Sequence, residues 1–128
     1  MGGSDGSGDV LVVEDDEQIN ELVGAYAQIA GFGYRRALDG AAGLRAAQEH
    51  PPALIILDLM LPDTDGFEVC RRLKGDAQTA TVPIMMLTAL NGEEQRRKGL
   101  SCGAAHYMTK PFDPDRLIAE IKSNARKG

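Results

Sequence analysis

Short, almost wholly apolar runs recur along the chain, and they limit the fold more than any other feature of the sequence. Three of these runs cover Val10–Val13, Leu54–Leu57 and Pro83–Leu87, and polar residues follow each of them. A continuous apolar run of this length is typical of a strand that is buried on both faces of a sheet. Such strands occur mainly in parallel sheets that helices cover on both sides. The sequence therefore predicts an α/β fold.

Segments with helical spacing separate these runs. In the first of them, apolar residues recur every three or four positions, at Ile19, Leu22, Val23, Tyr26 and Ile29. Four more helices are expected, the first over Asp39–His50 and the second from Asp65 through Leu73, where Asp65 and Glu68 have capping-box spacing. The third is expected over 91–103, with Leu100 as its chief apolar residue. The fourth begins at Asp113 and Pro114, with Leu117, Ile118 and Ile121 facing inward. Two weaker strands are expected over Tyr34–Leu38, at an edge, and Ala105–Thr109. The pattern is (βα)₅.

Composition and charge limit the class of protein and its partners. A chain of 128 residues, 43% of them hydrophobic, fits one domain with a real core. The net charge of −5 disfavours nucleic acid and anionic membranes as direct partners, and no apolar run approaches the ~20 residues of a membrane span.

Residues 1–8 are expected to be a disordered lead or vector-derived remnant, and the domain is expected to cover residues 9–127. Cys70 and Cys102 form no C-x-x-C pair, so we expect free thiols in a cytoplasmic protein.

Polar side chains follow the predicted strands where each strand ends. The acidic run Glu14–Asp16 comes after the first strand, Asp58 after the next buried one, Thr88 after the third and Lys110 after the last. In an open parallel sheet, ligands bind beyond the carboxyl ends of the strands, near the point where the strand order reverses. We therefore expect carboxylates, a hydroxyl and an amine to converge at one edge of the sheet.

The charges of these side chains indicate the chemistry of the expected site. Crowded carboxylates repel one another and favour a hard, oxygen-seeking cation such as Mg²⁺, for which Mn²⁺ could substitute. Lys110 would give an anion a second positive group, and Thr88 can donate a hydrogen bond to it. Such groups together stabilise the oxygens of a phosphoryl group during transfer, and Asp58 can serve as the nucleophile that forms an acyl phosphate.

Four motifs lie at the expected strand ends: Val12–Asp16, Leu57–Gly66, Leu87–Ala89 and Lys110–Phe112. In this order they resemble the motifs of response-regulator receiver domains, the chemotaxis-regulator-like domains of two-component signalling. Each motif is weak alone, but four together are specific, and the resemblance runs from Asp9 to the C-terminus. It implies a doubly wound, flavodoxin-like (βα)₅ fold, with five parallel strands in the order 2-1-3-4-5 and helices on both faces.

The resemblance also implies a role for each matched residue. Asp58 corresponds to the phosphoacceptor, and Lys110 to the lysine that pairs with the phosphoryl group. Asp15 corresponds to the residue that coordinates Mg²⁺ directly, and Glu14 to its acidic neighbour, which often acts through water. Met60 occupies the position that would offer the metal its backbone carbonyl only.

A switch and a set of partners follow from the same resemblance. Thr88 would move toward the phosphoryl group on activation, and Tyr107 corresponds to the aromatic residue that follows it inward. The Lys110–Pro111 bond corresponds to a peptide bond that is usually cis in the family. A histidine kinase or histidine phosphotransfer protein would supply the phosphoryl group to Asp58. An output domain or a downstream protein would be a further partner, with a phosphorylation-dependent dimer as another option. The chain would then be a signalling phosphoacceptor and not an enzyme.

Other polar or sulfur-containing residues are expected to have structural roles. They are Asp16 as a helix N-cap, Asp63 and Asp65 as loop and cap residues, His50 and His106 on the surface or in loops, and Cys70 as a small core residue.

Three competing functions fit the sequence less well. A phosphatase of the haloacid-dehalogenase class needs a second aspartate two residues after the nucleophile, where this chain has Met60. A flavodoxin needs a phosphate-cradling loop after the first strand, where Glu14–Asp16 would repel a phosphate. A receiver-like interaction module that acts without phosphorylation usually lacks the acidic pair, the acceptor or the lysine, and this chain has all of them. The sequence therefore favours a phosphoacceptor receiver.

Overall fold

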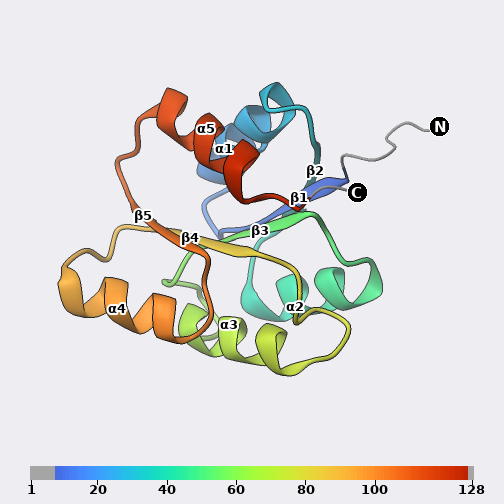
Figure 1. Cartoon of the computed structure of the whole chain (residues 1–128), viewed down its shortest axis with the longest axis vertical. Coiled ribbons are helices and arrows are strands. Elements are labelled where there is room, and N and C mark those ends of the chain that lie inside the picture. The colour runs from blue at the N-terminus through green and yellow to red at the C-terminus, as the bar shows by residue number, and fades with distance from the viewer. Residues whose placement is uncertain (1–7, 127–128) are drawn as a thin grey trace.

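The computed structural model describes residues 8–126, which form a five-stranded parallel sheet between two layers of helices (Figure 1). The strands are β1 (Asp9–Val13), β2 (Gly33–Ala37), β3 (Leu54–Leu57), β4 (Ile84–Thr88) and β5 (His106–Thr109). Their order in the sheet is β2-β1-β3-β4-β5, and every neighbouring pair is parallel. The expected α/β class, (βα)₅ pattern and 2-1-3-4-5 order are confirmed.

Five helices cover the sheet on both faces. They are α1 (Glu17–Ile29), α2 (Gly40–Glu49), α3 (Gly66–Gly75), α4 (Glu93–Ser101) and α5 (Pro114–Asn124). Helices α1 and α5 lie on one face, and α2, α3 and α4 lie on the other (Figure 1). Along β1, Leu11 and Val13 pack into the apolar layer under α2 and α3, whereas Val10 and Val12 pack into the layer under α1 and α5. Burial on both faces explains why this run of the sequence has no polar alternation.

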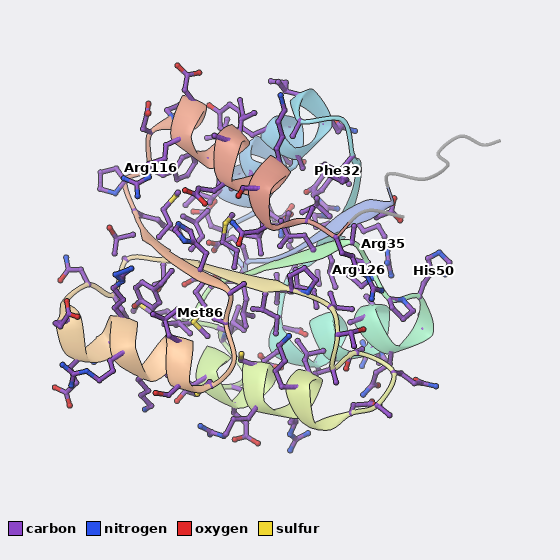
Figure 2. All side chains as sticks on the ribbon, in the orientation of Figure 1. Phe32, Arg35, His50, Met86, Arg116 and Arg126 are labelled. Carbon is purple, nitrogen blue, oxygen red and sulfur yellow. The ribbon has the colours of Figure 1, made fainter. Side chains whose placement is uncertain are left out.

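Strand β2 lies at an edge of the sheet, as its two arginines indicate. The Arg35 guanidinium donates hydrogen bonds to the backbone carbonyls of Ala46 and His50, both at 2.6 Å. Figure 2 shows Arg35 beside His50 where α2 ends. A cation at this position satisfies free carbonyls and interacts favourably with the negative end of the helix.

The last residue of the expected N-terminal lead is bonded to this edge strand. Gly8, which was expected within the lead, accepts a hydrogen bond from the N–H of Gly33 at 3.0 Å, and residues 1–7 lie outside the described part of the chain.

Aspartate N-caps begin four of the helices, because a carboxylate can accept the free N–H groups of a first turn. Asp16, Asp39, Asp65 and Asp113 each accept one such bond, at distances of 2.8–3.3 Å. The expected capping box at α3 forms only in part, because the Asp65 carboxylate accepts its bond from the N–H of Phe67. The carboxylate of Glu68, which would complete the box, pairs instead with Arg71 at 2.6 Å and with Arg72 at 3.2 Å.

Helix α4 is weakly anchored, as its few apolar positions indicate, but Leu100 is not the residue that holds it to the sheet. Leu100 is 41% exposed, and Gly99 is the residue that this helix buries. A Cβ atom at Gly99 would lie 2.7 Å from Met86 Sδ and 2.8 Å from Cδ2 of Tyr107. The helix backbone therefore lies directly on β4 and β5, and Leu100 is turned toward solvent. The N-cap of α4 is Gly92, which has no side chain to accept a bond, so α4 is weakly held at that end.

The inward stripe of α1 is also narrower than expected. Leu22 is exposed and Ile29, at the last position of the helix, is 65% exposed. The buried positions are instead Asn20, Val23, Gly24 and Ala27. Two of these are small, so the helix packs close to the sheet and turns its larger apolar residues partly outward.

The two glycines at the ends of α3 allow a matched test of this packing. A Cβ atom at Gly66 would lie 2.5 Å from the carbonyl oxygen of Asp58 and 2.6 Å from Cα of Leu59, whereas a Cβ atom at Gly75 would have open space around it beyond the adjacent backbone. Gly66→Ala should lower the free energy of unfolding by about 2 kcal/mol, because backbone must move. Gly75→Ala should leave it unchanged or raise it by up to about 1 kcal/mol. Urea unfolding followed by circular dichroism measures both, and equal effects would contradict this close approach.

Candidate functional site

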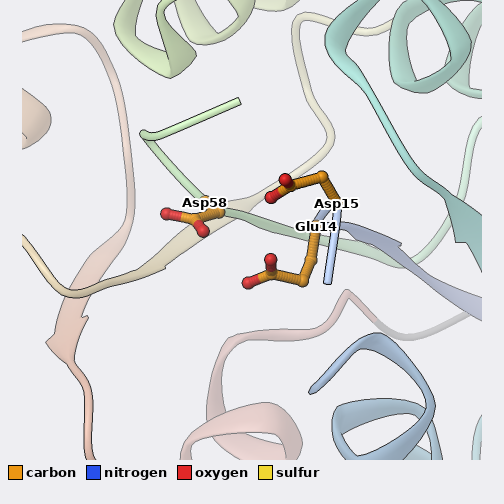
Figure 3. A group of neighbouring side chains, drawn as sticks. All are labelled: Glu14, Asp15 and Asp58. Atoms are coloured by element: carbon orange, nitrogen blue, oxygen red, sulfur yellow. The ribbon is translucent and has the colours of Figure 1, made fainter. Parts of the chain in front are cut away.

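Three carboxylates meet at the carboxyl end of the sheet, where β1 and β3 are neighbours (Figure 3). Glu14 and Asp15 follow β1, Asp58 follows β3, and one carboxylate oxygen from each lies within 4.8 Å of the others. The N–H of Asp58 donates to the carbonyl of Val13 at 3.0 Å, which aligns the two strand ends. Glu14 and Asp58 are only 4% and 6% exposed, whereas Asp15 is open to solvent. The predicted acidic residues are therefore brought together.

Lys110 connects two of these carboxylates. Its ammonium nitrogen lies 2.5 Å from Oε1 of Glu14 and 3.2 Å from Oδ2 of Asp58. Its backbone N–H donates to the carbonyl of Thr88 at 2.8 Å, so the residue after β5 is fixed against the end of β4. The peptide bond between Lys110 and Pro111 is cis, as expected.

Burial and charge shift the proton affinities of this pair. Burial raises the pKa of Glu14 above its usual range, although the bonds from Lys110 and from the N–H of Asp16 act in the opposite direction. Burial alone would lower the pKa of Lys110, but the bond to Glu14 and the charge of Asp58 outweigh it and raise that pKa. The lysine therefore stays charged at neutral pH, and its bond to Glu14 favours the ionised form of that carboxylate.

The donor set fits a divalent cation that prefers oxygen ligands. When ionised, the carboxylates of Glu14, Asp15 and Asp58 each carry one negative charge, and the single ammonium of Lys110 compensates only one of them. Mg²⁺ is usually held by one or two carboxylates and keeps several of its waters. The solvent-exposed carboxylate of Asp15 next to the buried one of Asp58 suits that mode of binding.

The two expected switch residues meet at one backbone position. Thr88 is fully buried at the end of β4, and its hydroxyl oxygen accepts a hydrogen bond from the N–H of Leu90 at 3.3 Å. The Tyr107 side chain lies inward, and its hydroxyl donates to the carbonyl of Leu90 at 2.8 Å. Burial raises the pKa of Tyr107, and the charge of Asp58 adds to that shift, so the hydroxyl keeps its proton.

The loop after β3 forms an open pocket beside the carboxylates. The N–H of Met60 donates to Oδ1 of Asp58 at 3.1 Å, while the Met60 side chain is 56% exposed. The pocket has a volume of about 740 Å³, and Met60, Leu90 and Asp15 are among the residues that line it. Farther along the loop, the carboxylate of Asp63 accepts the N–H groups of Gly40 and Ala41 at 2.8 and 3.0 Å, and these bonds lower the pKa of Asp63.

Sequence motifs alone did not indicate every residue that contacts this edge. Asn20 lies fully buried on α1 and donates a hydrogen bond to the carbonyl of Glu14 at 2.9 Å. The one available signal was a polar residue within the apolar spacing of that helix. His106 lies in β5, within the strand expected over Ala105–Thr109, so the surface or loop position also expected for it is wrong: the residue is partly buried, and its Nε2 atom is buried 3.7 Å from Oε1 of Glu120. The other cysteine and histidine expectations fit, since Cys70 is buried and His50 exposed.

Comparison with known proteins agrees with this geometry. The family model for the response regulator receiver domain matches residues 10–122. The transcriptional regulator RpaA of Synechocystis is 42% identical over 118 residues, which are 92% of this chain and 49% of RpaA. The chain belongs to the response-regulator receiver family, and it spans about half the length of such curated relatives.

Solved structures give the same result for the fold. A putative response regulator from Chloroflexus aurantiacus superposes with a TM-score of 0.85 at 34% identity, covering 91% of this chain and 95% of that one. The BeF₃-activated receiver domain of DrrB superposes with a TM-score of 0.83, also at 34% identity and with the same coverage. Within residues 8–126, none of the helices is long and apolar enough to cross a membrane.

Removal of the lysine tests the electrostatics of the site. Lys110→Met should lower the free energy of unfolding by about 3 kcal/mol at neutral pH without added metal, because it leaves two buried carboxylates unpaired. The double variant with Asp58→Asn should recover part of this loss. Urea unfolding measures both, with Lys122→Met on the exposed face of α5 as the control.

The pH dependence of the variant gives a second check on its sign. Burial raises the pKa of Glu14 in the folded state, and the loss of Lys110 removes a contact that lowers it. A raised folded-state pKa stabilises the protonated form, so the deficit of Lys110→Met should shrink as the pH falls toward about 5. If Lys110→Met loses as much free energy of unfolding at pH about 5 as at neutral pH, this account of the site would be contradicted.

Proposed function

We propose that this domain accepts a phosphoryl group on Asp58 from the phosphohistidine of a histidine kinase or histidine phosphotransfer protein, with Mg²⁺ or Mn²⁺ bound. The observation that carries the proposal is the buried Asp58 carboxylate, held together with Glu14, Asp15 and the ammonium of Lys110 at the carboxyl end of the sheet. A strand-end carboxylate beside both an acidic pair and a lysine suits phosphoryl transfer, in which a cation and an ammonium neutralise the charge of the transferred group.

Each residue of the site has a distinct proposed task. Oδ1 of Asp58 is fixed by the N–H of Met60, and Oδ2 faces Lys110, so the carboxylate is oriented before a phosphodonor arrives. Asp15, Asp58 and the carbonyl of Met60 would hold the metal, and Glu14 would act through water. The bound cation would offset negative charge on the phosphoryl oxygens. Lys110 would exchange part of its pairing with Glu14 for an oxygen of the phosphoryl group.

The proposed switch runs from the site to α4. A phosphoryl group on Asp58 would attract the hydroxyl of Thr88, which now accepts a bond from the N–H of Leu90. Tyr107 holds the carbonyl of the same residue and contacts the helix at Gly99. Because α4 is weakly capped and keeps Leu100 in solvent, a change at Leu90 would shift the surface formed by α4, β5 and α5.

The proposed partners follow from this scheme. We propose a receiver domain over residues 9–127 that acts in the cytoplasm, as a signalling phosphoacceptor and not as an enzyme with a substrate to turn over. An output domain or a downstream protein would read the switched surface, with a phosphorylation-dependent dimer as one form of the output. The net charge of −5 favours proteins over nucleic acid as the direct partners of this domain.

Intact-mass measurement after incubation with Mg²⁺ and acetyl phosphate tests the proposal. The wild type should gain the mass of one phosphoryl group, and the gain should be absent without Mg²⁺ and in Asp58→Asn. Asp63→Asn, which changes a nearby loop aspartate outside the carboxylate cluster, is the control and should be labelled like the wild type. A wild type that gains no mass, or an Asp58→Asn variant that gains as much, would overturn the proposal and favour an interaction module that acts without phosphorylation.

The lifetime of the phosphoryl group is a separate prediction. Met60 and Leu90 present apolar side chains to the pocket beside Asp58 and should hinder an attacking water. The mass gain should therefore decay more slowly in the wild type than in Met60→Asn once the donor is removed. Leu22→Asn, a similar change at an exposed position of α1, should decay like the wild type. Equal decay of the wild type and Met60→Asn would show that this apolar flank does not protect the site.

A further inference from the structure

A buried asparagine ties together the ends of two strands beneath the carboxylate cluster. The Nδ2 group of Asn20 donates to the carbonyls of Val12 at 3.1 Å, Glu14 at 2.9 Å and Ala37 at 3.1 Å. An amide nitrogen carries two hydrogens, so at least one of them is shared between carbonyls. Val12 lies near the end of β1, Glu14 directly follows β1, and Ala37 is the last residue of β2.

A tyrosine on the edge strand fixes the orientation of this amide. The hydroxyl of Tyr34 donates to Oδ1 of Asn20 at 2.5 Å, so the oxygen of the amide is held away from the carbonyls and its nitrogen toward them. Burial raises the pKa of Tyr34, so its hydroxyl remains a donor. The ring lies against α1 at Gly24, where a Cβ atom would lie 2.5 Å from the ring. A glycine at this position is therefore required for the tyrosine to reach Asn20.

The peptide group held by Asn20 is the one that joins Glu14 to Asp15. Glu14 is further held by its N–H, which donates to the carbonyl of Ala37 at 3.1 Å. Its carboxylate accepts the N–H of Asp16 at 2.9 Å and the ammonium of Lys110. Asp15, by contrast, is exposed. The direction of its carboxylate therefore depends on the peptide group before it, which Asn20 fixes.

We propose that Asn20, oriented by Tyr34, is a positioning residue for the cation site and sets the direction of the Asp15 carboxylate. The inference rests on the proposed function, because it assigns these residues to the binding of Mg²⁺ by Asp15. Groups that orient metal ligands are often worth about 10-fold or more in metal affinity without touching the metal. Neither residue lies in the four motifs that define the family resemblance.

The competing interpretation is that Asn20 only satisfies carbonyls at the ends of the strands. In that case its loss would lower stability but leave the affinity for a cation unchanged. Tyr34→Phe separates the two interpretations, because it removes one hydroxyl and leaves the amide and all three carbonyls in place. Its matched control is Tyr26→Phe on α1, where the lost hydroxyl makes no hydrogen bond to any residue between 8 and 126.

The experiment is calorimetric titration of the full chain with Mg²⁺, alongside urea unfolding of each variant. Tyr34→Phe should raise the dissociation constant for Mg²⁺ about 10-fold, Asn20→Ala should raise it at least as much, and Tyr26→Phe should leave it unchanged. If Asn20→Ala does not fold, Tyr34→Phe still decides the question. Thr79→Val removes a different buried hydroxyl, which donates to the carbonyl of Leu73 at 2.6 Å far from the carboxylates, and it should lower stability alone.

The possible outcomes separate this inference from the proposed function. A wild type that binds no Mg²⁺ contradicts the proposed function itself. A wild type that binds Mg²⁺, with Tyr34→Phe within two-fold of it, overturns the positioning role and leaves the proposed function intact. If Thr79→Val raises the dissociation constant for Mg²⁺ as much as Tyr34→Phe does, the positioning role is likewise overturned, because the affinity for Mg²⁺ would then follow general stability.

Discussion

The ammonium of Lys110 holds two buried carboxylates, Glu14 and Asp58, that would otherwise repel each other at adjacent strand ends. The rest of the site depends on this contact, because carboxylates with so little access to water are costly to ionise without a partner. One lysine cannot balance three acidic groups, and the excess negative charge makes the site favourable for a divalent cation. The charges that Lys110 offsets in the folded protein are therefore the same charges that a bound cation or phosphoryl group would change.

The connections around the site explain how a local charge change could reach the surface. Thr88 and Tyr107 bind the N–H and the carbonyl of Leu90, and the Tyr107 ring lies against α4 where Gly99 leaves room for it. Helix α4 is attached mainly through that close contact, whereas α3 has a side-chain cap and a continuous buried stripe. A helix with few apolar anchors is the element that a small free-energy change can move most easily.

Much of this could be predicted from the sequence, because the decisive features are local. The apolar runs identify β1, β3 and β4, and the residues after them identify the carboxylate cluster. What could not be predicted depends on close tertiary contacts. Leu100 is exposed because Gly99 brings the backbone of α4 onto Met86 and Tyr107, and spacing along one helix carries no information about that approach.

The contact between Asn20 and Tyr34 could not be predicted for a similar reason. It joins a helix to an edge strand through a hydroxyl and an amide, and it exists only because Gly24 lets the ring approach α1. The partial burial of His106 could not be predicted, because a lone histidine gives no local signal of burial. The capping box at α3 was not predicted correctly either, because the carboxylate of Glu68 pairs with Arg71 and Arg72, so Asp65 alone caps the helix.

The central claim is that the acidic strand ends form a cation-dependent phosphoacceptor site. The most direct measurement is anomalous diffraction from crystals of the protein soaked in Mn²⁺, which locates the metal and its ligands together. The account predicts a metal peak bonded to the carboxylates of Asp15 and Asp58 and to the carbonyl of Met60. A saturating soak that gives no peak at these residues, or a peak bound only elsewhere on the protein, would contradict it.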